Sequence, residues 1–363
     1  MVKPNFWEGK KVFVTGHTGF KGAWLSIWLH KLGAFVTGYS KTVNEQQEVF
    51  YDDIKSIFSE THYGDIIDAQ SLESCITAAQ PDVIFHLAAQ PIVRRSYLIP
   101  VETFATNMMG SVNLLEIVRK TPSVKAVVMV TSDKCYKPEP LNGAFTENDP
   151  LGGNDPYSAS KACAEIAIHS YVKSFFSGMR SLGCNASIAT ARAGNIIGGG
   201  DWGEDRLIPD LVRGLLNSET TEIRSPNYVR PWQFVLDALS GYMLLAERLY
   251  HEGDKFTGSW NFGPTIDQCL SVREVVSKFV HPTDIKVTYN VSQRTSKPEE
   301  TRLSIDASKA EKNLSWRRLM TFEESIQLTR DWYLNFFQGE SPRNLCERQI
   351  NIYKNYFSHK AQG

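Results

Sequence analysis

Short apolar runs alternate with segments of helical periodicity through most of this chain. Runs that are apolar throughout predict strands covered on both faces, and a repeat near 3.6 residues predicts helices. This alternation predicts an α/β fold with an open, doubly wound parallel sheet of the Rossmann type. The predicted strands are 11–15, 34–39, 61–66 (with a turn), 82–89, 127–130, 186–192 and 258–263, and the predicted helices are 23–32, 107–120, 157–176 and 237–250, with a short helix from 206.

The alternation breaks after residue 193. A glycine-rich loop follows at 194–203, the segment 224–232 mixes arginines with aromatic residues, and no second Rossmann repeat follows. We therefore predict two domains interleaved in sequence. Residues 1–193 and 234–264 form the dinucleotide-binding domain, and residues 194–233 and 265–363 form a smaller substrate domain whose arginines suit a diphosphate.

Composition narrows the class of protein. The chain has 363 residues, 42% of them hydrophobic and 22% charged, which is typical of a globular protein with one large or two unequal domains. A net charge of −1 gives no reason to expect nucleic acid as a partner. The six cysteines are scattered without a Cys-x-x-Cys pair, which predicts neither a disulfide framework nor a metal site. Without a signal peptide or a membrane-length apolar run, we expect a cytoplasmic protein with no membrane partner.

A glycine loop joins the first predicted strand to the first helix. Gly16, Gly19 and Gly22 permit a tight turn and close approach of a pyrophosphate to the helix N-terminus. His17 and Lys21 are bulky and polar for such a loop. We expect Lys21 to be solvated, although both side chains could also modulate how tightly a dinucleotide is held. The predicted cofactor-binding residues of this loop are Gly16, His17, Thr18, Gly19, Phe20, Lys21 and Gly22.

The next strands supply the remaining dinucleotide contacts. Ser40 could bond the ribose and the adjacent Lys41 could accept a 2′-phosphate, so these residues leave NAD and NADP both open. Asp65 is either an adenine contact or a helix cap. The further predicted cofactor contacts are Ile66, Leu87, Ala88 and Ala89. His86, within an apolar run, is interpreted as a core histidine.

Reactive side chains follow the strand at 127–130. Thr131 and Ser132 stand where a parallel strand ends, which is where ligands bind in such sheets. Tyr157 and Lys161 are four residues apart and share one helix face. An ammonium beside a phenol favours the phenolate, so we expect Lys161 to lower the pKa of Tyr157 and prepare it to take a proton from an alcohol. A surface pair without chemistry is the alternative.

Several motifs together resemble one family. Thr15-Gly16-x-x-Gly19-x-x-Gly22, Leu87-Ala88-Ala89, Asn107, Tyr157-x-x-x-Lys161 and Arg192-x-x-Asn195 resemble the extended short-chain dehydrogenase/reductase superfamily. Within it, His86 to Gln90, Thr131 to Tyr136 and Gly198 to Trp202 resemble the CDP-glucose 4,6-dehydratases. The related dTDP-glucose enzymes have Glu where this chain has Gln90 and Lys134. The resemblance implies NAD, CDP-glucose as substrate, and a homo-oligomer built around the helices containing Asn107 and Tyr157. It also implies a role in deoxysugar synthesis for bacterial surface polysaccharides such as O-antigen.

The resemblance also implies a set of roles. Tyr157, assisted by Lys161 and Ser132, would deprotonate the sugar 4-hydroxyl. Lys134 would remove the C5 proton and Asp133 would protonate the leaving 6-hydroxyl; burial should push both towards their neutral forms, and a structural Asp–Lys salt bridge is the alternative. A 4-epimerase, a dehydratase for another nucleotide-hexose and a non-catalytic dinucleotide sensor remain open. The predicted substrate-binding residues are Gln90, Asn195, Arg206, Leu207, Arg230, Trp232, Arg294 and Glu299.

Overall fold

A seven-stranded sheet organises the molecule. The structure, a computed structural model, describes residues 2–43, 45–138, 143–177, 185–281, 285–289 and 301–360. The sheet order is β11-β6-β5-β4-β1-β2-β3, and every neighbouring pair runs parallel, which confirms the predicted Rossmann-type sheet. Its strands are β1 (Lys11–Thr15), β2 (Phe35–Ser40), β3 (Phe58–Tyr63), β4 (Val83–His86), β5 (Ala126–Val130), β6 (Ser187–Ala193) and β11 (Gly258–Phe262).

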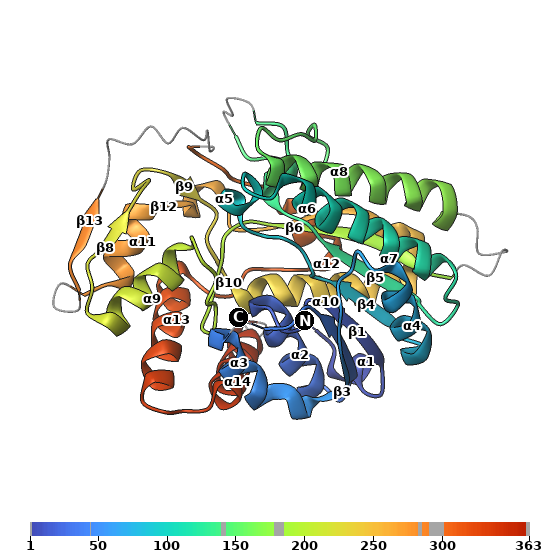
Figure 1. Cartoon of the computed structure of the whole chain (residues 1–363), viewed down its shortest axis with the longest axis horizontal. Helices are drawn as coiled ribbons and strands as arrows, with labels where there is room; N and C mark the ends of the chain where they lie inside the picture. The colour runs from blue at the N-terminus through green and yellow to red at the C-terminus, as the bar shows by residue number, and fades with distance from the viewer. Residues whose placement is uncertain are drawn as a thin grey trace.

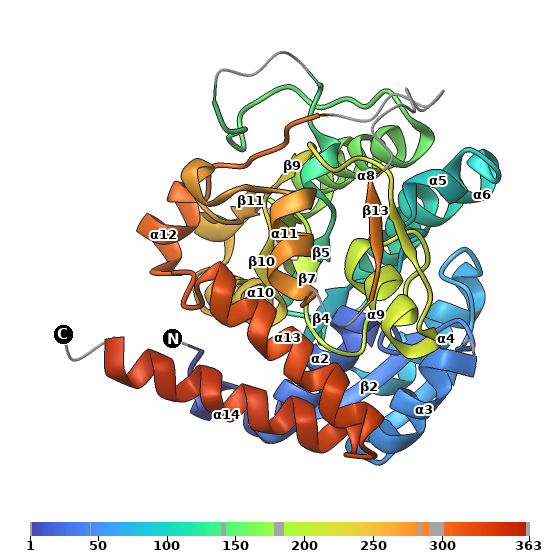
Figure 2. The same ribbon diagram turned by 90° about the vertical axis from the view of Figure 1, so that its left-hand side faces the viewer.

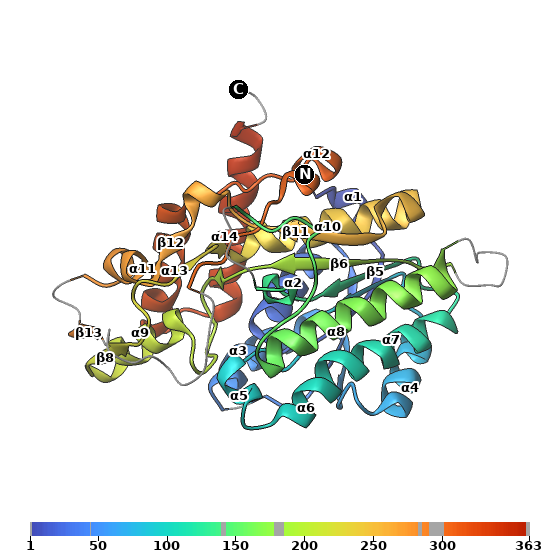
Figure 3. The same ribbon diagram turned by 90° about the horizontal axis from the view of Figure 1, so that it is seen from above.

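Helices cover both faces of this sheet (Figure 3). One face carries α4 (Ala69–Ala79), α7 (Gly110–Arg119) and α8 (Pro156–Tyr171), and the other carries α2 (Phe20–Lys31) and α10 (Val235–Glu252). Successive strand residues point to opposite faces. Phe13 therefore packs with the apolar side chains of α4 and α7, whereas Val12 and Val14 pack with those of α2 and α10.

A second group of elements lies at the carboxyl-terminal side of the sheet, to the left in Figure 1. Three two-stranded sheets join segments that are far apart in sequence. These pair β7 (Ile196–Ile197) with β10 (Gln233–Phe234), β9 (Val229–Arg230) with β12 (Leu270–Ser271), and β8 (Thr221–Ile223) with β13 (Val287–Tyr289). The helices here are α9 (Leu207–Asn217), α11 (Val272–Phe279) and α13 (Phe322–Phe337), whereas α12 (Ser308–Leu314) packs against α10 and β11.

The last helix returns to the sheet. After α13, the helix α14 (Pro342–Lys360) packs against α2 and α3 (Glu45–Ile54), as Figure 2 shows. Within the described ranges, no helix has both the length and the apolar character needed to cross a bilayer.

Helix boundaries differ from prediction where the site is built. The helix α2 begins at Phe20, three residues earlier than predicted, so part of the glycine loop belongs to its first turn. The helix α8 begins as predicted because Asp155 caps it, accepting a hydrogen bond from the Ser158 amide at 2.9 Å, and Pro156 occupies its first turn. It continues as a wider turn over Val172–Phe176.

Candidate active site

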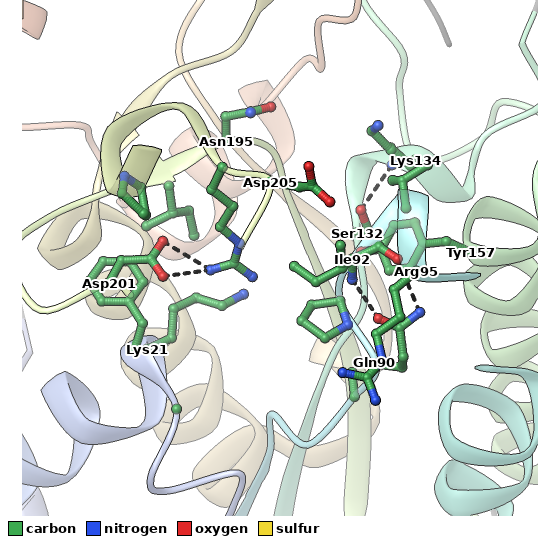
Figure 4. Close-up of a pocket in the computed structure, with 18 of the residues that line it drawn as sticks. Lys21, Gln90, Ile92, Arg95, Ser132, Lys134, Tyr157, Asn195, Asp201 and Asp205 are labelled. Carbon is green, nitrogen blue, oxygen red and sulfur yellow. Dashed lines mark hydrogen bonds and ion pairs between the residues drawn. The ribbon is translucent and has the colours of Figure 1, made fainter. Parts of the chain in front are cut away.

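A cleft of about 1050 Å³ opens at the carboxyl ends of β1, β2, β4 and β5 (Figure 4). Every predicted site residue within the described ranges lines it, except His17. Arg294 and Glu299 lie outside the described residues. Figure 4 shows Ser132, Lys134 and Tyr157 on one wall, with Lys21 and Asp201 across the cleft.

The glycine loop has the geometry of a phosphate cradle. Gly16 has a φ of +75°, and a Cβ there would lie 2.7 Å from the Ala88 amide nitrogen. A Cβ on Gly22 would lie 2.1 Å from the Gly16 carbonyl oxygen. Side chains are therefore excluded where the first turn of α2 meets the loop, which leaves backbone N–H groups accessible to an anion.

The far end of the cleft is polar and partly paired. The Ser40 and Thr18 hydroxyls are 2.5 Å apart. Asp65 Oδ2 lies 2.8 Å from Lys41 Nζ, which is also 3.6 Å from a Glu102 carboxylate oxygen. Asp68, not Asp65, caps α4. The helix-cap alternative for Asp65 is therefore wrong, and its carboxylate belongs to the cleft.

His17 is placed behind the loop rather than in the cleft, which corrects its assignment as a cofactor contact. Its ring is fully buried against Tyr51 and Phe58. Gly38 makes this possible, because a Cβ there would lie 2.4 Å from the imidazole. Burial lowers the pKa of His17 to about 4, so the ring is neutral at pH 7.

Lys21 is only partly exposed, rather than solvated as expected. It lies in the first turn of α2 and its side chain points into the cleft (Figure 4), with Nζ 6.0 Å from the centre of the Tyr242 ring. Burial lowers the pKa of Lys21 to about 7, and the nearby cations Lys161 and Arg206 lower it further. The positive charge that this residue can carry therefore faces the ligand space.

The turn after β5 presents three polar side chains to the cleft. The Ser132 hydroxyl donates to Asp133 Oδ1 at 3.1 Å and accepts from the Lys134 amide at 3.2 Å. These bonds hold a single turn of 3-10 helix over Asp133–Cys135. The polar segment after β5 is therefore a hydrogen-bonded turn at the carboxyl end of a central strand.

Tyr157 and Lys161 are both buried on the cleft side of α8. The prediction of a lowered pKa for Tyr157 is wrong for this structure. Burial raises the pKa of Tyr157 to about 12, against a hydrogen bond with Ser132 that lowers it, and the charge of Asp133 raises it further. Burial also lowers the pKa of Lys161 to about 8, although Glu165 opposes this. Desolvation dominates both groups because each is more than nine-tenths buried.

Asp133 follows the prediction. Its side chain is 4% exposed, and its Oδ2 atom has no hydrogen-bond partner. Burial raises the pKa of Asp133 to about 6, against the charge of Lys134 and the Ser132 hydrogen bond. A carboxyl group in this state can act as a proton donor close to neutral pH.

The side chain of Gln90 forms hydrogen bonds that stabilise the loop after β4. Its side-chain oxygen accepts from the Ile92 amide at 2.7 Å, and its amide nitrogen donates to Thr103 Oγ1 at 3.1 Å. Asn107 accepts from the Gln90 backbone amide at 2.8 Å and donates to Ser160 on α8 at 2.9 Å. Gln90 thus lines the cleft as part of a fixed wall.

His86 is a core histidine, as predicted. Its ring nitrogens lie 2.8 Å from Thr15 Oγ1 and 3.3 Å from Ser111 Oγ. Burial lowers the pKa of His86 to about 3. It therefore stays neutral and joins β1, β4 and α7 beneath the cleft.

The opposite wall is basic. Arg206 is the residue just before α9, and it donates to both carboxylate oxygens of Asp201 at 2.9 Å. Sequence analysis assigned no site role to Asp201 or to an ion-pair cluster at the cleft mouth, where Asp205 lies 2.9 Å from both Arg94 and Arg224. These residues come from three separate segments, and no local pattern indicated that they would meet. The remaining predicted wall residues, Asn195, Leu207, Arg230 and Trp232, also line the cleft.

Comparisons with known proteins agree with this geometry. A family model described as GDP-mannose 4,6 dehydratase matches residues 13–329. The chain is 42% identical over 353 residues to a CDP-glucose 4,6-dehydratase of Salmonella typhimurium, covering 97% of this chain and 98% of that protein. A crystal structure of dTDP-glucose 4,6-dehydratase from Bacillus anthracis with NAD is 25% identical, with a TM-score of 0.71 and coverage of 92% of this chain and 99% of that one. A UDP-glucose 4-epimerase from Stenotrophomonas maltophila with bound NAD has a TM-score of 0.76 at 21% identity, covering 91% of this chain and 100% of that one, and shares the fold.

Proposed function

This chain belongs to the GDP-mannose 4,6-dehydratase family, and on that premise we propose that it is an NAD-dependent lyase that converts CDP-glucose to CDP-4-keto-6-deoxyglucose and water. One observation carries the proposal. Asp133 and Lys134, an acid and a base that a 4-epimerase does not need, share a turn with Ser132 on the same wall as Tyr157. The identity to a CDP-glucose enzyme supports cytidine over other bases.

The residues of the first half of the cleft fit NAD. At Gly16 and Gly22 a residue with a side chain would clash with the backbone, and the two glycines leave room for a pyrophosphate beside the loop. Lys41 lies between the carboxylates of Asp65 and Glu102, which would repel a 2′-phosphate and therefore favour NAD over NADP. NAD bound there would accept a hydride from sugar C4 and return it to C6.

The chain's own residues move the protons. Tyr157 takes the proton of the 4-hydroxyl, and Ser132, hydrogen-bonded to the phenol, stabilises the phenolate. Lys161, on the same face of α8, contributes its positive charge to the same end. The resulting 4-ketone acidifies the C5 proton, because the carbanion is delocalised as an enolate.

Elimination of water across the C5–C6 bond needs a base near C5 and an acid near the 6-hydroxyl. Lys134 removes the C5 proton while Asp133 gives a proton to the departing 6-hydroxyl. The raised pKa of Asp133 supports the acid role. Because the two groups are adjacent and opposite in charge, we treat them as one coupled pair that exchanges a proton between them.

The remaining expectations form part of the same proposal. We propose that residues 194–233 and 265–363 bind the nucleotide-sugar, with Arg206 and Arg230 facing its diphosphate. Large exposed apolar side chains lie on and beside α6 (Pro100–Phe104), α7 and α8, which supports a homo-oligomer through these helices; they are Leu98, Val101, Met109 and Ile166. The five described cysteines are all free, which suits a reducing cytoplasm. We place the product in deoxysugar synthesis for surface polysaccharide.

A nucleotide screen in deuterated water tests this function. CDP-, dTDP-, UDP- and GDP-glucose are each incubated with the enzyme and NAD in ²H₂O, and products are analysed by NMR. A 4-keto-6-deoxy product from CDP-glucose with one deuterium at C5 is expected. A C4 epimer without deuterium at C5 indicates an epimerase, a keto product from another nucleotide indicates a different substrate, and no product from any of the four removes the proposal.

A further inference from the structure

A buried ion pair lies directly behind the catalytic turn. Arg192, on β6, donates to Glu165 Oε2 at 2.7 Å, and the two side chains are 3% and 2% exposed. Glu165 is one helical turn beyond Lys161 on α8, so it follows Tyr157 and Lys161 along the same face. Burying two charges is costly, and paired hydrophobic residues often stabilise such a site equally well. A stability role alone therefore does not account for it.

The pair is connected to the catalytic turn at both ends of that turn. Thr131, the residue before Ser132, donates to Glu165 Oε1 at 2.5 Å. Tyr136, immediately after the 3-10 turn, accepts from Arg192 Nη1 at 2.9 Å. The turn that carries Ser132, Asp133 and Lys134 is thus held from behind through the residues that flank it on either side.

The same hydrogen-bond network extends to residues 304–306. The Tyr136 hydroxyl donates to Asn261 Oδ1 at 2.6 Å, and the Asn261 amide donates to the backbone oxygens of Phe145 and Asp306 at 2.9 and 3.1 Å. Phe145 stacks on the Tyr136 ring and exchanges backbone hydrogen bonds with Ser304 and Asp306. Residues 304–306 belong to the segment that we assign to the substrate domain.

We propose that Glu165 and Arg192 are positioning residues, which hold the Ser132–Lys134 turn in register with Tyr157 and Lys161 and tie that turn to residues 304–306. Neither residue of the pair lines the cleft. Proton transfer needs precise positions. The acid and the base must stay within hydrogen-bond reach of the reacting atoms, and a displacement of about 1 Å costs about 100-fold in rate. The proposal rests on the proposed dehydratase activity.

The decisive variant removes both charges together. Glu165→Met with Arg192→Met leaves no unpaired buried charge, so we expect a folded protein with a melting temperature close to wild type. If the pair positions the turn, kcat falls about 10- to 100-fold, KM for CDP-glucose changes less than about twofold, and NAD affinity is unchanged. If the pair only stabilises the fold, the double variant keeps the wild-type kcat together with wild-type stability, and that result overturns the proposal.

A milder variant gives an independent measure. Tyr136→Phe removes one hydroxyl and no charge, and Tyr353→Phe is its matched control, since that buried hydroxyl bonds Asp237 and Ser240 away from the cleft. We expect Tyr136→Phe to lower kcat about tenfold and to speed hydrogen exchange of the amides at 131–136, whereas Tyr353→Phe leaves both unchanged. Equal kcat for wild type and Tyr136→Phe, with unchanged exchange at 131–136, contradicts the proposal.

The pH profile gives a readout that a structural role does not move. The charge of Glu165 raises the pKa of Lys161 against its burial. In the double methionine variant the kinetic limb that belongs to Lys161 should move to lower pH, and an unmoved limb contradicts the assignment. Wild-type turnover in the same assay tests the dehydratase function separately from the positioning role of the pair. An inactive wild type refutes the dehydratase function, whereas hydrogen exchange at 131–136 still tests whether the pair holds the turn.

Discussion

Replacing Asp133 by Asn should stabilise the ligand-free protein while it damages catalysis. The side chain is buried, and its pKa is raised from the ordinary value of 3.8 to about 6. At about 1.36 kcal/mol per pKa unit, that difference amounts to about 3 kcal/mol, which is an upper estimate of what ionising this carboxyl costs the folded state. Asn keeps the shape and the oxygen that accepts from Ser132, and it never ionises.

The sign of the effect depends on pH. A carboxyl whose folded pKa is raised contributes stability that is fully present below pH 3.8 and is lost as pH rises through about 6. Wild type and Asp133→Asn should therefore unfold alike near pH 4, and the variant should be more stable by up to about 3 kcal/mol above pH 7. Asp237, which is also buried with a raised pKa, is present in both proteins and cancels in the difference.

Urea unfolding at pH 4, 5.5, 7 and 8, followed by fluorescence and circular dichroism, measures this difference. Glu204→Gln is the control, since it makes the same kind of substitution at an exposed carboxylate and should show no such pH dependence. Product formation by Asp133→Asn should fall about 100-fold, because the proton donor for the 6-hydroxyl is lost. A variant that is equally or less stable at pH 8, or whose stability difference does not change with pH, refutes the reasoning.

Three further predictions follow from the cleft. Lys134→Ala should bind CDP-glucose within about twofold of wild type but form product about 100-fold more slowly, as measured by calorimetry and single-turnover NMR; unaltered turnover removes Lys134 from the mechanism. Gly22→Ala should weaken NAD binding about 10- to 100-fold, since its Cβ would overlap the Gly16 carbonyl oxygen, whereas Gly19→Ala, with 3.4 Å to the same atom, should weaken it less; equal losses in a titration argue against the cradle. Lys21→Met should raise NAD affinity about tenfold, because a bound dinucleotide would further bury an ammonium that is already poorly solvated and repelled by Lys161 and Arg206, and an unchanged dissociation constant contradicts that account.

Local chemistry made much of the fold and part of the site predictable. The strand at 127–130, its polar turn and the cap at Asp155 follow from apolar runs, proline and capping residues that act over a few positions. Lys21 was misplaced because the helix begins at Phe20 rather than Ala23, which moves the side chain from a loop into the first helical turn. Helix ends are set by tertiary packing as well as by local sequence.

Long-range features were beyond the reach of sequence patterns. Glu165 and Arg192 are 27 residues apart and meet because α8 packs against the strand that follows it. The high pKa of Tyr157 reflects complete burial, which spacing to Lys161 does not reveal. Both features depend on contacts and burial that arise only in the tertiary structure.

The central claim is that one enzyme molecule borrows a hydride from C4 and returns it to C6 of the same sugar. CDP-glucose labelled with deuterium at C4 tests this most directly, with the product analysed by NMR and mass spectrometry in ordinary water. The account predicts that the deuterium appears in the C6 methyl group of CDP-4-keto-6-deoxyglucose. Deuterium retained at C4, or released to solvent, would contradict it.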